Sequence, residues 1–207
     1  MKSKSLKVLA IGAHPDDIEL GCFGALARHA SSGDDVTILV LTAGESGGEP
    51  TIRKQESRES GAIIGANVFF VGLADTLIRD DHSSILPIEQ AIQRLKADVI
   101  YTPSFKDRHQ DHRNTSRATI SAARTVHEVY LYETPSTVQD FSPQLFVNVT
   151  DFFSKKLEAI RKHKSQRKRY YMVHEAVRGL AKFRAYQAGI GANAYAEAFE
   201  IALIVRK

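Results

Sequence analysis

Short apolar segments alternate with longer segments of helical periodicity along most of this chain. Five segments rich in β-branched and aromatic residues are predicted strands: 7–13, 35–43, 67–72, 98–103 and 128–134. Several are apolar at nearly every position, which is typical of strands covered on both faces. Four segments between them have helical spacing: 18–32, 51–65, 84–97 and 112–126. This alternation predicts an α/β fold, a Rossmann-like, doubly wound, mostly parallel sheet flanked by helices.

The last third of the chain is expected to continue the same domain. Residues 145–153 are predicted to form a strand that enters a helix, residues 155–190 have a helical pattern, and residues 198–207 form a final predicted strand. No repeat, low-complexity tract or long linker divides the sequence, and a chain of 207 residues can bury a full core. We therefore expect residues 1–207 to form a single domain.

Cysteine usage, hydropathy and charge exclude several classes of protein. Cys22 is the only cysteine, so neither an internal disulfide nor a cysteine-based zinc site can form, which suits a reducing cytoplasm. No window approaches the roughly 18 apolar residues of a membrane span, and the first apolar run is too short for a signal peptide. The net charge of +4 is mild, and no recognised nucleic-acid-binding motif accompanies it. We expect a cytoplasmic protein with no nucleic-acid partner and no membrane span.

Much of the positive charge lies in one segment, RKHKSQRKR at 161–169. Runs of charge usually belong to a solvated helix end or loop, and that is one interpretation of this segment. The other interpretation is that the segment attracts an anionic substrate, such as one that carries phosphate, or a membrane surface. The sequence leaves both open.

The segment GAHPDDIELGC at 12–22 concentrates a histidine and three carboxylates directly after the first predicted strand. In open parallel sheets, reactive groups gather beyond the carboxyl ends of the strands. A second loop, SFKDRHQDHRN at 104–114, follows the fourth predicted strand and repeats this chemistry. The first segment alone could be a turn that caps a helix. Two such loops at the same edge of the sheet instead predict a reaction centre.

A catalytic zinc site takes three nitrogen or oxygen ligands from the protein and leaves a fourth position for water. His14, Asp17 and His112 can supply these three ligands. Asp16 would then be free to accept a proton from water that the metal activates. Two histidines and one aspartate also accept Fe²⁺, Co²⁺ or Mn²⁺, so zinc is expected but another divalent ion is possible.

The remaining residues of the second loop fit supporting roles. His109 would donate a hydrogen bond to the developing oxyanion or a proton to the leaving amine. Asp111 would fix the orientation or the tautomer of a histidine. Glu19, in the first turn of a predicted helix, is interpreted as a group that interacts with the helix dipole or supports the site. The other histidines have no acidic partner at ligand spacing and are expected to be ordinary: His29, His82, His127, His163 and His174.

The segments AHPDDIELG (13–21) and HQDH (109–112) resemble the signature motifs of the LmbE-like, or PIG-L, zinc-dependent N-acetylglucosaminyl deacetylases. The likeness extends to LTAGE, IRKQES, GLAD at 72–75, KHKSQ at 162–166 and YAEAF at 195–199. The resemblance implies the same three zinc ligands, with Asp16 as general base and His109 stabilising the oxyanion under the influence of Asp111. It also implies the bond that is cleaved, the acetamide of an N-acetylglucosamine unit.

The resemblance also points to two substrate-binding candidates, Arg53 and Asp75. The arginine that matches Arg53 in relatives lies at the substrate pocket; a surface arginine that pairs with Glu56 at i, i+3 is the alternative. Asp75 matches a family position, but it could be a structural cap or hydrogen-bond anchor. Glu197 also matches a family position and is interpreted as structural.

We therefore expect a zinc-dependent hydrolase that removes the acetyl group from a small N-acetyl amino-sugar substrate. A sugar conjugate, a sugar nucleotide and a glycolipid all remain open as that substrate. The alternatives are an amidase of the same mechanism on another N-acyl conjugate, and a non-catalytic sugar- or nucleotide-binding domain. Because relatives are often oligomers, a homo-oligomer is a further expectation.

Overall fold

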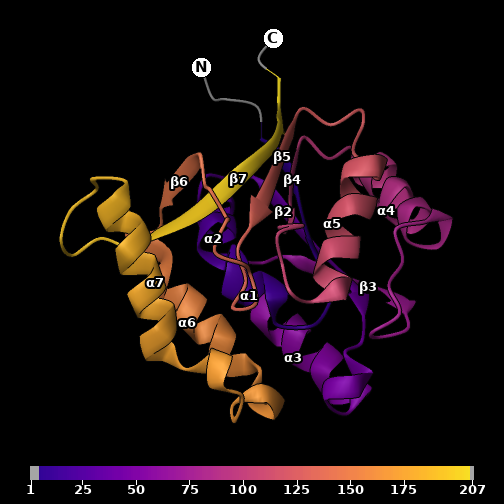
Figure 1. The fold of residues 1–207 in the computed structure, drawn as a ribbon, viewed down its shortest axis with the longest axis horizontal. Coiled ribbons are helices and arrows are strands. Elements are labelled where there is room, and N and C mark those ends of the chain that lie inside the picture. Colours follow the sequence, from indigo (N-terminus) through magenta and orange to yellow (C-terminus); the bar gives the residue numbers. More distant parts are fainter. Residues whose placement is uncertain (1–4, 206–207) are drawn as a thin grey trace.

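Seven strands form one sheet in the computed structural model, which describes residues 5–205 (Figure 1). The strands are β1 (Lys7–Gly12), β2 (Asp35–Thr42), β3 (Asn67–Leu73), β4 (Val99–Pro103), β5 (Glu128–Tyr132), β6 (Leu145–Asn148) and β7 (Ala196–Ile204). Their order across the sheet is β3-β2-β1-β4-β5-β7-β6. Neighbouring strands from β3 to β5 pair in parallel, and β7 is antiparallel to both β5 and β6. The predicted mostly parallel α/β sheet is confirmed.

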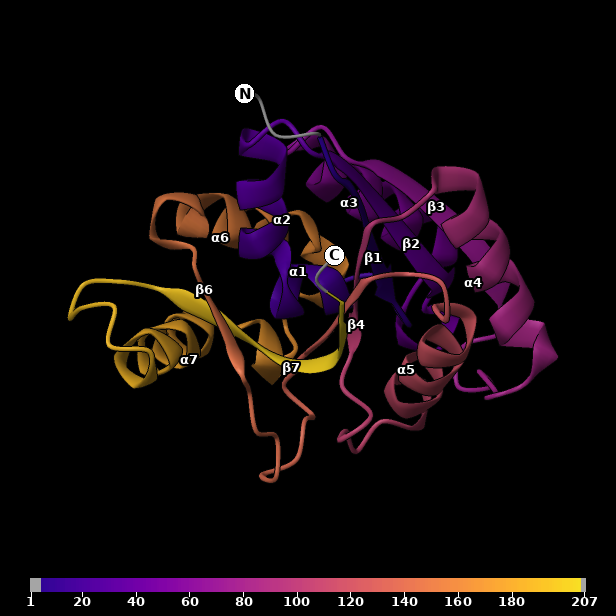
Figure 2. The ribbon, with the colours of Figure 1, turned by 90° about the horizontal axis from the view of Figure 1, so that it is seen from above.

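Helices cover both faces of this sheet (Figure 2). They are α1 (Asp17–Gly21), α2 (Phe23–Ser31), α3 (Pro50–Ala62), α4 (His82–Leu95), α5 (Gln110–Ala122), α6 (Phe153–Lys162) and α7 (His174–Gln187). α4 and α5 lie on one face, whereas α1, α2 and α3 lie on the other with α6 packed against them. α7 packs against β7 and β6.

The alternation of side chains along β1 builds the core on both faces. Val8 and Ala10 pack into the cluster that contains residues of α1 and α2, and Leu9 and Ile11 pack into the cluster that contains residues of α4 and α5. Successive side chains of a strand point to opposite faces, so a strand covered on both sides must be apolar throughout. This explains why the central strands are continuous apolar runs.

The strand order reverses between β1 and β4. The chain moves outward from β1 through β2 to β3, then returns to place β4 on the other side of β1. Such a switch point leaves a crevice at the carboxyl ends of the two strands. The loops that follow β1 and β4 are the two histidine-rich segments, so the topology brings them together.

Two predicted helices are wrong in detail. The predicted helix at 18–32 is divided at Cys22 into α1 and α2, and Gly21 at the end of α1 lies so close to the ring of Tyr132 that a Cβ would overlap it. The predicted helix at 155–190 is α6 and α7 separated by two short 3₁₀ turns, Lys164–Gln166 and Tyr170–Met172, because this stretch folds inward and buries His163 and Gln166.

The last strand is also displaced from its prediction. β7 begins at Ala196, two residues before the predicted start, and ends at Ile204. Residues 206–207, which the prediction included, lie outside the described residues.

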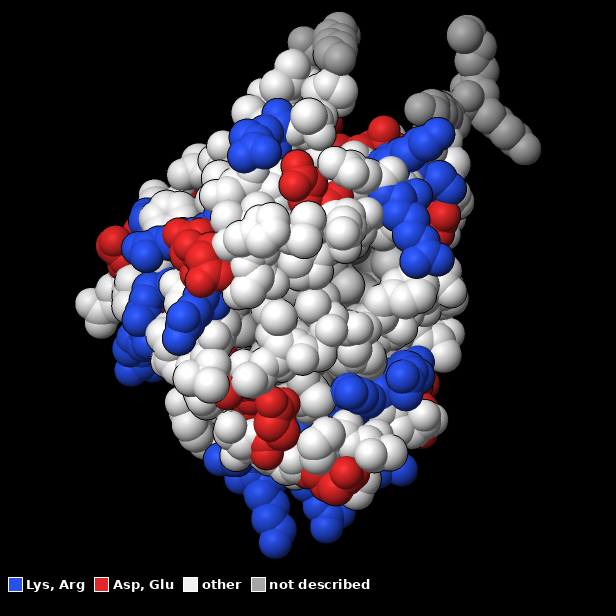
Figure 3. Space-filling view, turned by 90° about the vertical axis from the view of Figure 1, so that its right-hand side faces the viewer, with Lys and Arg blue, Asp and Glu red and all other residues white. Residues whose placement is uncertain are grey.

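The surface over α4 and α5 carries charges of both signs in separate groups around an uncharged central area, and no continuous basic stripe crosses this face (Figure 3). Among residues 5–205, no helix combines the length and the apolar character needed to cross a membrane.

Candidate active site

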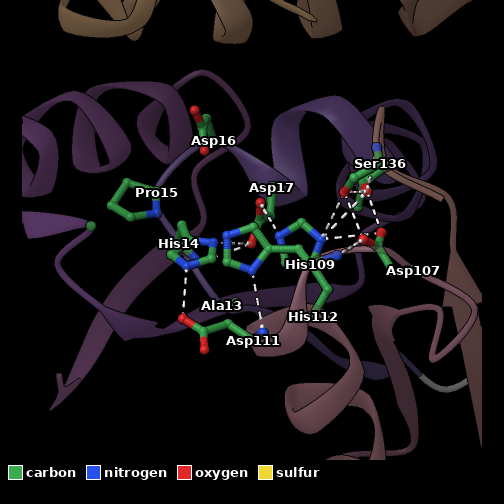
Figure 4. A network of polar contacts seen from close by, with 12 residues as sticks. Ala13, His14, Pro15, Asp16, Asp17, Asp107, His109, Asp111, His112 and Ser136 are labelled. Carbon is green, nitrogen blue, oxygen red and sulfur yellow. Dashed lines mark hydrogen bonds and ion pairs between the residues drawn. The ribbon is translucent and has the colours of Figure 1, made fainter. Parts of the chain in front are cut away.

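The two histidine-rich loops meet at the carboxyl ends of β1 and β4 (Figure 4). The ring centres of His14 and His112 lie 5.4 Å apart, and the ring of His109 lies 4.7 Å from each. His14 follows β1, whereas His109 and His112 lie at the beginning of α5, the helix after β4. The predicted convergence of these loops is therefore present in the structure.

His14, Asp17 and His112 are arranged as a set of metal ligands could be. His112 Nε2 lies 3.1 Å from Asp17 Oδ1, and His14 Nδ1 lies 3.4 Å from Asp17 Oδ2. One ligand atom of each residue can be chosen so that all three lie within 4.8 Å of one another. Ligand atoms about 2.0–2.2 Å from a tetrahedral zinc ion lie about 3.4 Å apart. The donor types, their spacing and their burial therefore fit a divalent ion.

The turn that presents these ligands is built by residues 14–17. The carboxylate of Asp17 accepts a hydrogen bond of 2.8 Å from the backbone N–H of His14. Asp16, between Pro15 and Asp17, has φ of 107°, a left-handed conformation that non-glycine residues rarely adopt. Backbone strain of this kind is retained where the surrounding structure requires one side-chain direction.

Asp107 is a site residue to which sequence reasoning assigned no role. Its Oδ2 lies 3.1 Å from His112 Nδ1, and its carboxylate accepts hydrogen bonds of 2.6 Å from Thr134 and Ser136. Burial favours the neutral acid, but the hydrogen bonds from His112, Ser136 and Thr134 hold the pKa of Asp107 well below its usual range. A carboxylate on the second nitrogen of a ligating histidine fixes its tautomer and orientation. The signal in the sequence was the position of Asp107 in DRHQDH.

His14 contacts carboxylates through both ring nitrogens. Nδ1 faces Asp17, and Nε2 lies 3.0 Å from Asp75 and 3.1 Å from Asp111. Burial lowers the pKa of His14, but the charge of Asp17 and the hydrogen bonds to Asp111, Asp17 and Asp75 raise it well above its usual value. The carboxylate of Asp111 therefore contacts His14. The resemblance suggested that it would instead tune the ring of His109.

Asp75 is an anchor for His14 and for the loop after β2. Its Oδ2 accepts a hydrogen bond of 2.9 Å from the backbone of Ser46, while Oδ1 contacts His14. Burial raises the pKa of Asp75, but the hydrogen bond and the charge of His14 lower it to about 2. Asp75 also lines the pocket described below, so its predicted contact with substrate stays a prediction.

Asp16 is the buried carboxylate next to the candidate metal ligands. Its Oδ1 lies 3.4 Å from Arg53 Nη2, and its Oδ2 is buried without a hydrogen-bond partner. Burial raises the pKa of Asp16 to about 6, although the charge of Arg53 lowers it. Asp16 also lines the pocket described below, where a carboxylate with a free oxygen is a candidate general base.

Arg53 holds this turn in place from α3. Its guanidinium donates hydrogen bonds of 2.7 Å to the carbonyls of Gly44 and Pro15, and Gly44 has φ of 68° with no room for a side chain beside the guanidinium. Arg53 does not pair with Glu56, so the alternative of a surface pair is wrong. Glu56 accepts hydrogen bonds from Ser165 instead. Arg53 also lines the pocket, and its contact with substrate stays a prediction.

His109 caps the N-terminus of α5. Its Nδ1 accepts a hydrogen bond of 3.2 Å from the backbone N–H of Asp111. Burial and the charges of His112 and His14 lower the pKa of His109. With Nδ1 accepting, the neutral ring carries its proton on Nε2, which leaves Nε2–H as a donor.

These residues surround a pocket of about 330 Å³. That volume is at the lower end of the range of about 300–1,000 Å³ typical of small-molecule sites. Of the basic segment 161–169, Gln166 and Arg169 line the pocket. The pocket wall includes all the site residues predicted from the sequence except Asp111: His14, Asp16, Asp17, Arg53, Asp75, His109 and His112.

Three residues outside the two loops have partners that bear on their predictions. His163 is fully buried with Nε2 at 3.1 Å from Glu19 Oε1, and His29 Nδ1 lies 2.7 Å from Asp34. Among residues 5–205 neither histidine belongs to a group that could hold a metal ion, and their interpretation as ordinary histidines stays a prediction. Glu197 accepts hydrogen bonds from the backbone of α2, as expected of a structural residue.

Comparison with known proteins places this site in a family. Residues 9–123, more than half of the chain, match the model of the PIG-L family, which is described as GlcNAc-PI de-N-acetylase. This chain belongs to the PIG-L family. The membership expected from the two motifs is thereby confirmed, and both motifs lie inside the matched range.

This chain is similar in sequence to two PIG-L relatives and in structure to one solved protein. YaiS, an uncharacterized deacetylase of Escherichia coli strain K12, is 41% identical over 172 residues, which are 79% of this chain and 93% of YaiS. The diacetylchitobiose deacetylase of Thermococcus kodakarensis is 26% identical over 189 residues, 77% of this chain and 70% of that protein. A solved structure that resembles this chain is the crystal structure of GalB, a 4-carboxy-2-hydroxymuconate hydratase of Pseudomonas putida KT2440. It has a TM-score of 0.85 at 22% identity and covers 99% of this chain and 98% of GalB. At this identity the likeness shows the fold alone.

Proposed function

We propose that this PIG-L protein is a metal-dependent hydrolase that removes the acetyl group from a small molecule containing N-acetylglucosamine. The observation that carries the proposal is the arrangement of His14, Asp17 and His112 as three buried candidate ligands, next in the chain to Asp16, whose Oδ2 has no hydrogen-bond partner. The family description and the diacetylchitobiose deacetylase both point to an N-acetyl sugar. Zn²⁺ is the expected ion, and Fe²⁺ is an alternative with the same ligands.

A divalent ion held by these three residues would act as a Lewis acid on water and on the acetyl carbonyl. Asp16 accepts the proton that the attacking water loses, because its Oδ2 has no other partner. Arg53 keeps the Asp16 turn in position through the carbonyl of Pro15. Asp107 and Asp111 hold the rings of His112 and His14, so that each presents one nitrogen to the pocket.

His109 acts on the opposite side of the reacting bond. Its Nε2–H donates a hydrogen bond to the oxygen on which negative charge develops as water adds to the carbonyl. The C–N bond then breaks, the proton that Asp16 accepted from water moves to the departing nitrogen, and the products are acetate and the free amine. The backbone N–H of Asp111 fixes the tautomer that this donation requires.

The fold alone does not decide between hydrolysis and hydration, because the hydratase GalB shares it. Deacetylation is favoured by the family description and by the 41% identical deacetylase YaiS, which outweigh a likeness of 22%. An amidase acting on another N-acyl conjugate would use the same residues, and the choice of acyl group has to be measured.

The test incubates the zinc-loaded protein with a panel of N-acetylated amino-sugar conjugates, other N-acyl compounds and an unsaturated acid. Free acetate and free amine are measured together, along with any hydrated acid. We expect equal amounts of both products from at least one N-acetylglucosamine conjugate, and their loss on adding a chelator. Release from other N-acyl compounds only would redirect the proposal to an amidase. Water addition to an unsaturated acid without any acetate release would overturn it in favour of a hydratase.

A further inference from the structure

A second pocket, of about 190 Å³, opens beside the catalytic pocket and is lined by residues of α1, β7 and α7. The two pockets share four lining residues: Leu20, Pro135, Tyr170 and Tyr171. The second pocket therefore adjoins the pocket that the candidate metal ligands line.

Apolar side chains make up most of the wall of this second pocket. α7 supplies Ala176, Val177, Leu180 and Ala181, while β7 supplies Ala196 and Ala198. α7 lies against β7 and beside α6, so these side chains form a wall next to the sheet (Figures 1 and 2).

The charged groups in this wall already have partners. Lys156 Nζ lies 2.5 Å from Glu197 Oε1 and also donates to the carbonyl of Leu20 at 2.7 Å. Glu133 accepts two hydrogen bonds from Arg184, of 2.8 and 2.6 Å. Burying a charged ligand group here would require a free opposite charge, which these paired residues do not supply.

From the adjacency of the two pockets and the apolar wall of the second, we propose that the second pocket binds an uncharged apolar aglycone while the acetamide lies in the first. This inference rests on the proposed deacetylase function. A dry cavity of about 150 Å³ is large enough to bind benzene, so this pocket suits one aromatic ring or a short alkyl chain. The preferred substrates are then alkyl or aryl glycosides of N-acetylglucosamine, ahead of the free sugar or a sugar nucleotide.

The deciding experiment compares kcat/KM of the zinc-loaded protein for the methyl, propyl and hexyl glycosides of N-acetylglucosamine and for uridine diphosphate N-acetylglucosamine. We expect kcat/KM to rise about two- to fourfold for each methylene that enters the pocket, until the pocket is full. The nucleotide sugar should be the poorest substrate. Equal values along the series, or a preference for the nucleotide sugar, would overturn the inference while leaving the deacetylase proposal standing. If no conjugate loses acetate, both fall.

Two variants of α7 assign the effect to this pocket. Leu180 and Phe183 are exposed to 40% and 52%, but only Leu180 lines the pocket. Leu180→Asp places an unpaired charge in the wall, and the ratio of hexyl to methyl kcat/KM should fall to within about twofold of one. Phe183→Asp puts the same charge on the same helix outside the pocket and should keep the wild-type ratio. Equal ratios in the two variants would show that the preference arises elsewhere.

Discussion

At the scale of single residues, the Asp16 carboxylate combines burial, a missing hydrogen-bond partner and a left-handed backbone. Asn adopts left-handed conformations more readily than Ala, so Asp16→Asn removes the basic oxygen with the least disturbance of the turn. We expect turnover to fall by about 10²- to 10⁴-fold, the usual range for acid–base catalysis. Zinc content, measured by elemental analysis, should stay at the wild-type value. Near-normal turnover would contradict the role of Asp16 as base.

A different effect is expected for Asp107, on metal affinity, because this residue contacts His112 and not the reacting groups. Asp107→Asn keeps an acceptor but removes the charge that orients the ring, and zinc affinity should fall by about 10- to 100-fold. His112→Ala removes the proposed ligand itself and should lose more. Competition with a coloured chelator gives both affinities. If Asp107→Asn binds zinc as the wild type does, His112 is held in place by other contacts.

At the scale of elements, the buried pair of His163 and Glu19 joins the segment after α6 to α1. Burial lowers the pKa of His163, but the charge of Glu19 outweighs burial and raises this pKa above 6.5. Burial raises the pKa of Glu19, but His163 and Ser60 outweigh burial and lower this pKa below 4.5. The stabilisation of the fold by His163 is complete below pH 6.5 and is lost as the pH rises through the folded pKa of His163. The stabilisation by Glu19 is present above pH 4.5 and is lost as the pH falls through the folded pKa of Glu19. The pair therefore stabilises the folded protein most between pH 4.5 and pH 6.5.

The corresponding measurement is urea unfolding of the wild type and His163→Gln, with a chelator present in both. The variant lacks the titrating group, so the wild type should exceed it in unfolding free energy by more at about pH 5.5 than at about pH 8.5. Removing one partner of a buried pair costs about 3–5 kcal/mol, which bounds the difference at the lower pH. A difference that does not change with pH would show that the folded and unfolded states bind the His163 proton equally, which would contradict the raised pKa.

The break between α1 and α2 gives a second prediction about elements. A Cβ on Gly21 would overlap the buried ring of Tyr132, so Gly21→Ala should lower the free energy of unfolding by about 1–3 kcal/mol. Gly179 lies inside α7 with nothing near its Cβ position, and Gly179→Ala should raise the free energy of unfolding by about 0.4–1 kcal/mol. Denaturant unfolding measures both. Similar effects of the two changes would contradict the close contact between Gly21 and Tyr132.

At the scale of the whole molecule, the fold can be predicted from the short-range pattern of the sequence. The candidate site can be predicted from that pattern only in part. Apolar runs such as 35–43 predict strands covered on both faces, and the parallel order then brings His14 and His112 to one edge. Asp107 lies in the same loop, but its contact with His112 also depends on Thr134 and Ser136 beyond β5. The pairing of His163 with Glu19 spans most of the chain and depends on how the segment after α6 folds inward. Such contacts depend on tertiary packing, which residue spacing does not encode.

The position of β7 has a consequence for how the protein is made. This strand follows β6 in the chain by almost fifty residues, yet it lies between β5 and β6, and β6 has no other partner in the described sheet. Glu197 in this strand also accepts hydrogen bonds from the backbone N–H groups of Gly24 and Ala25, at the beginning of α2. The surroundings of the turn that contains Asp16 therefore stay incomplete until synthesis has passed Glu197, far along the chain from that turn.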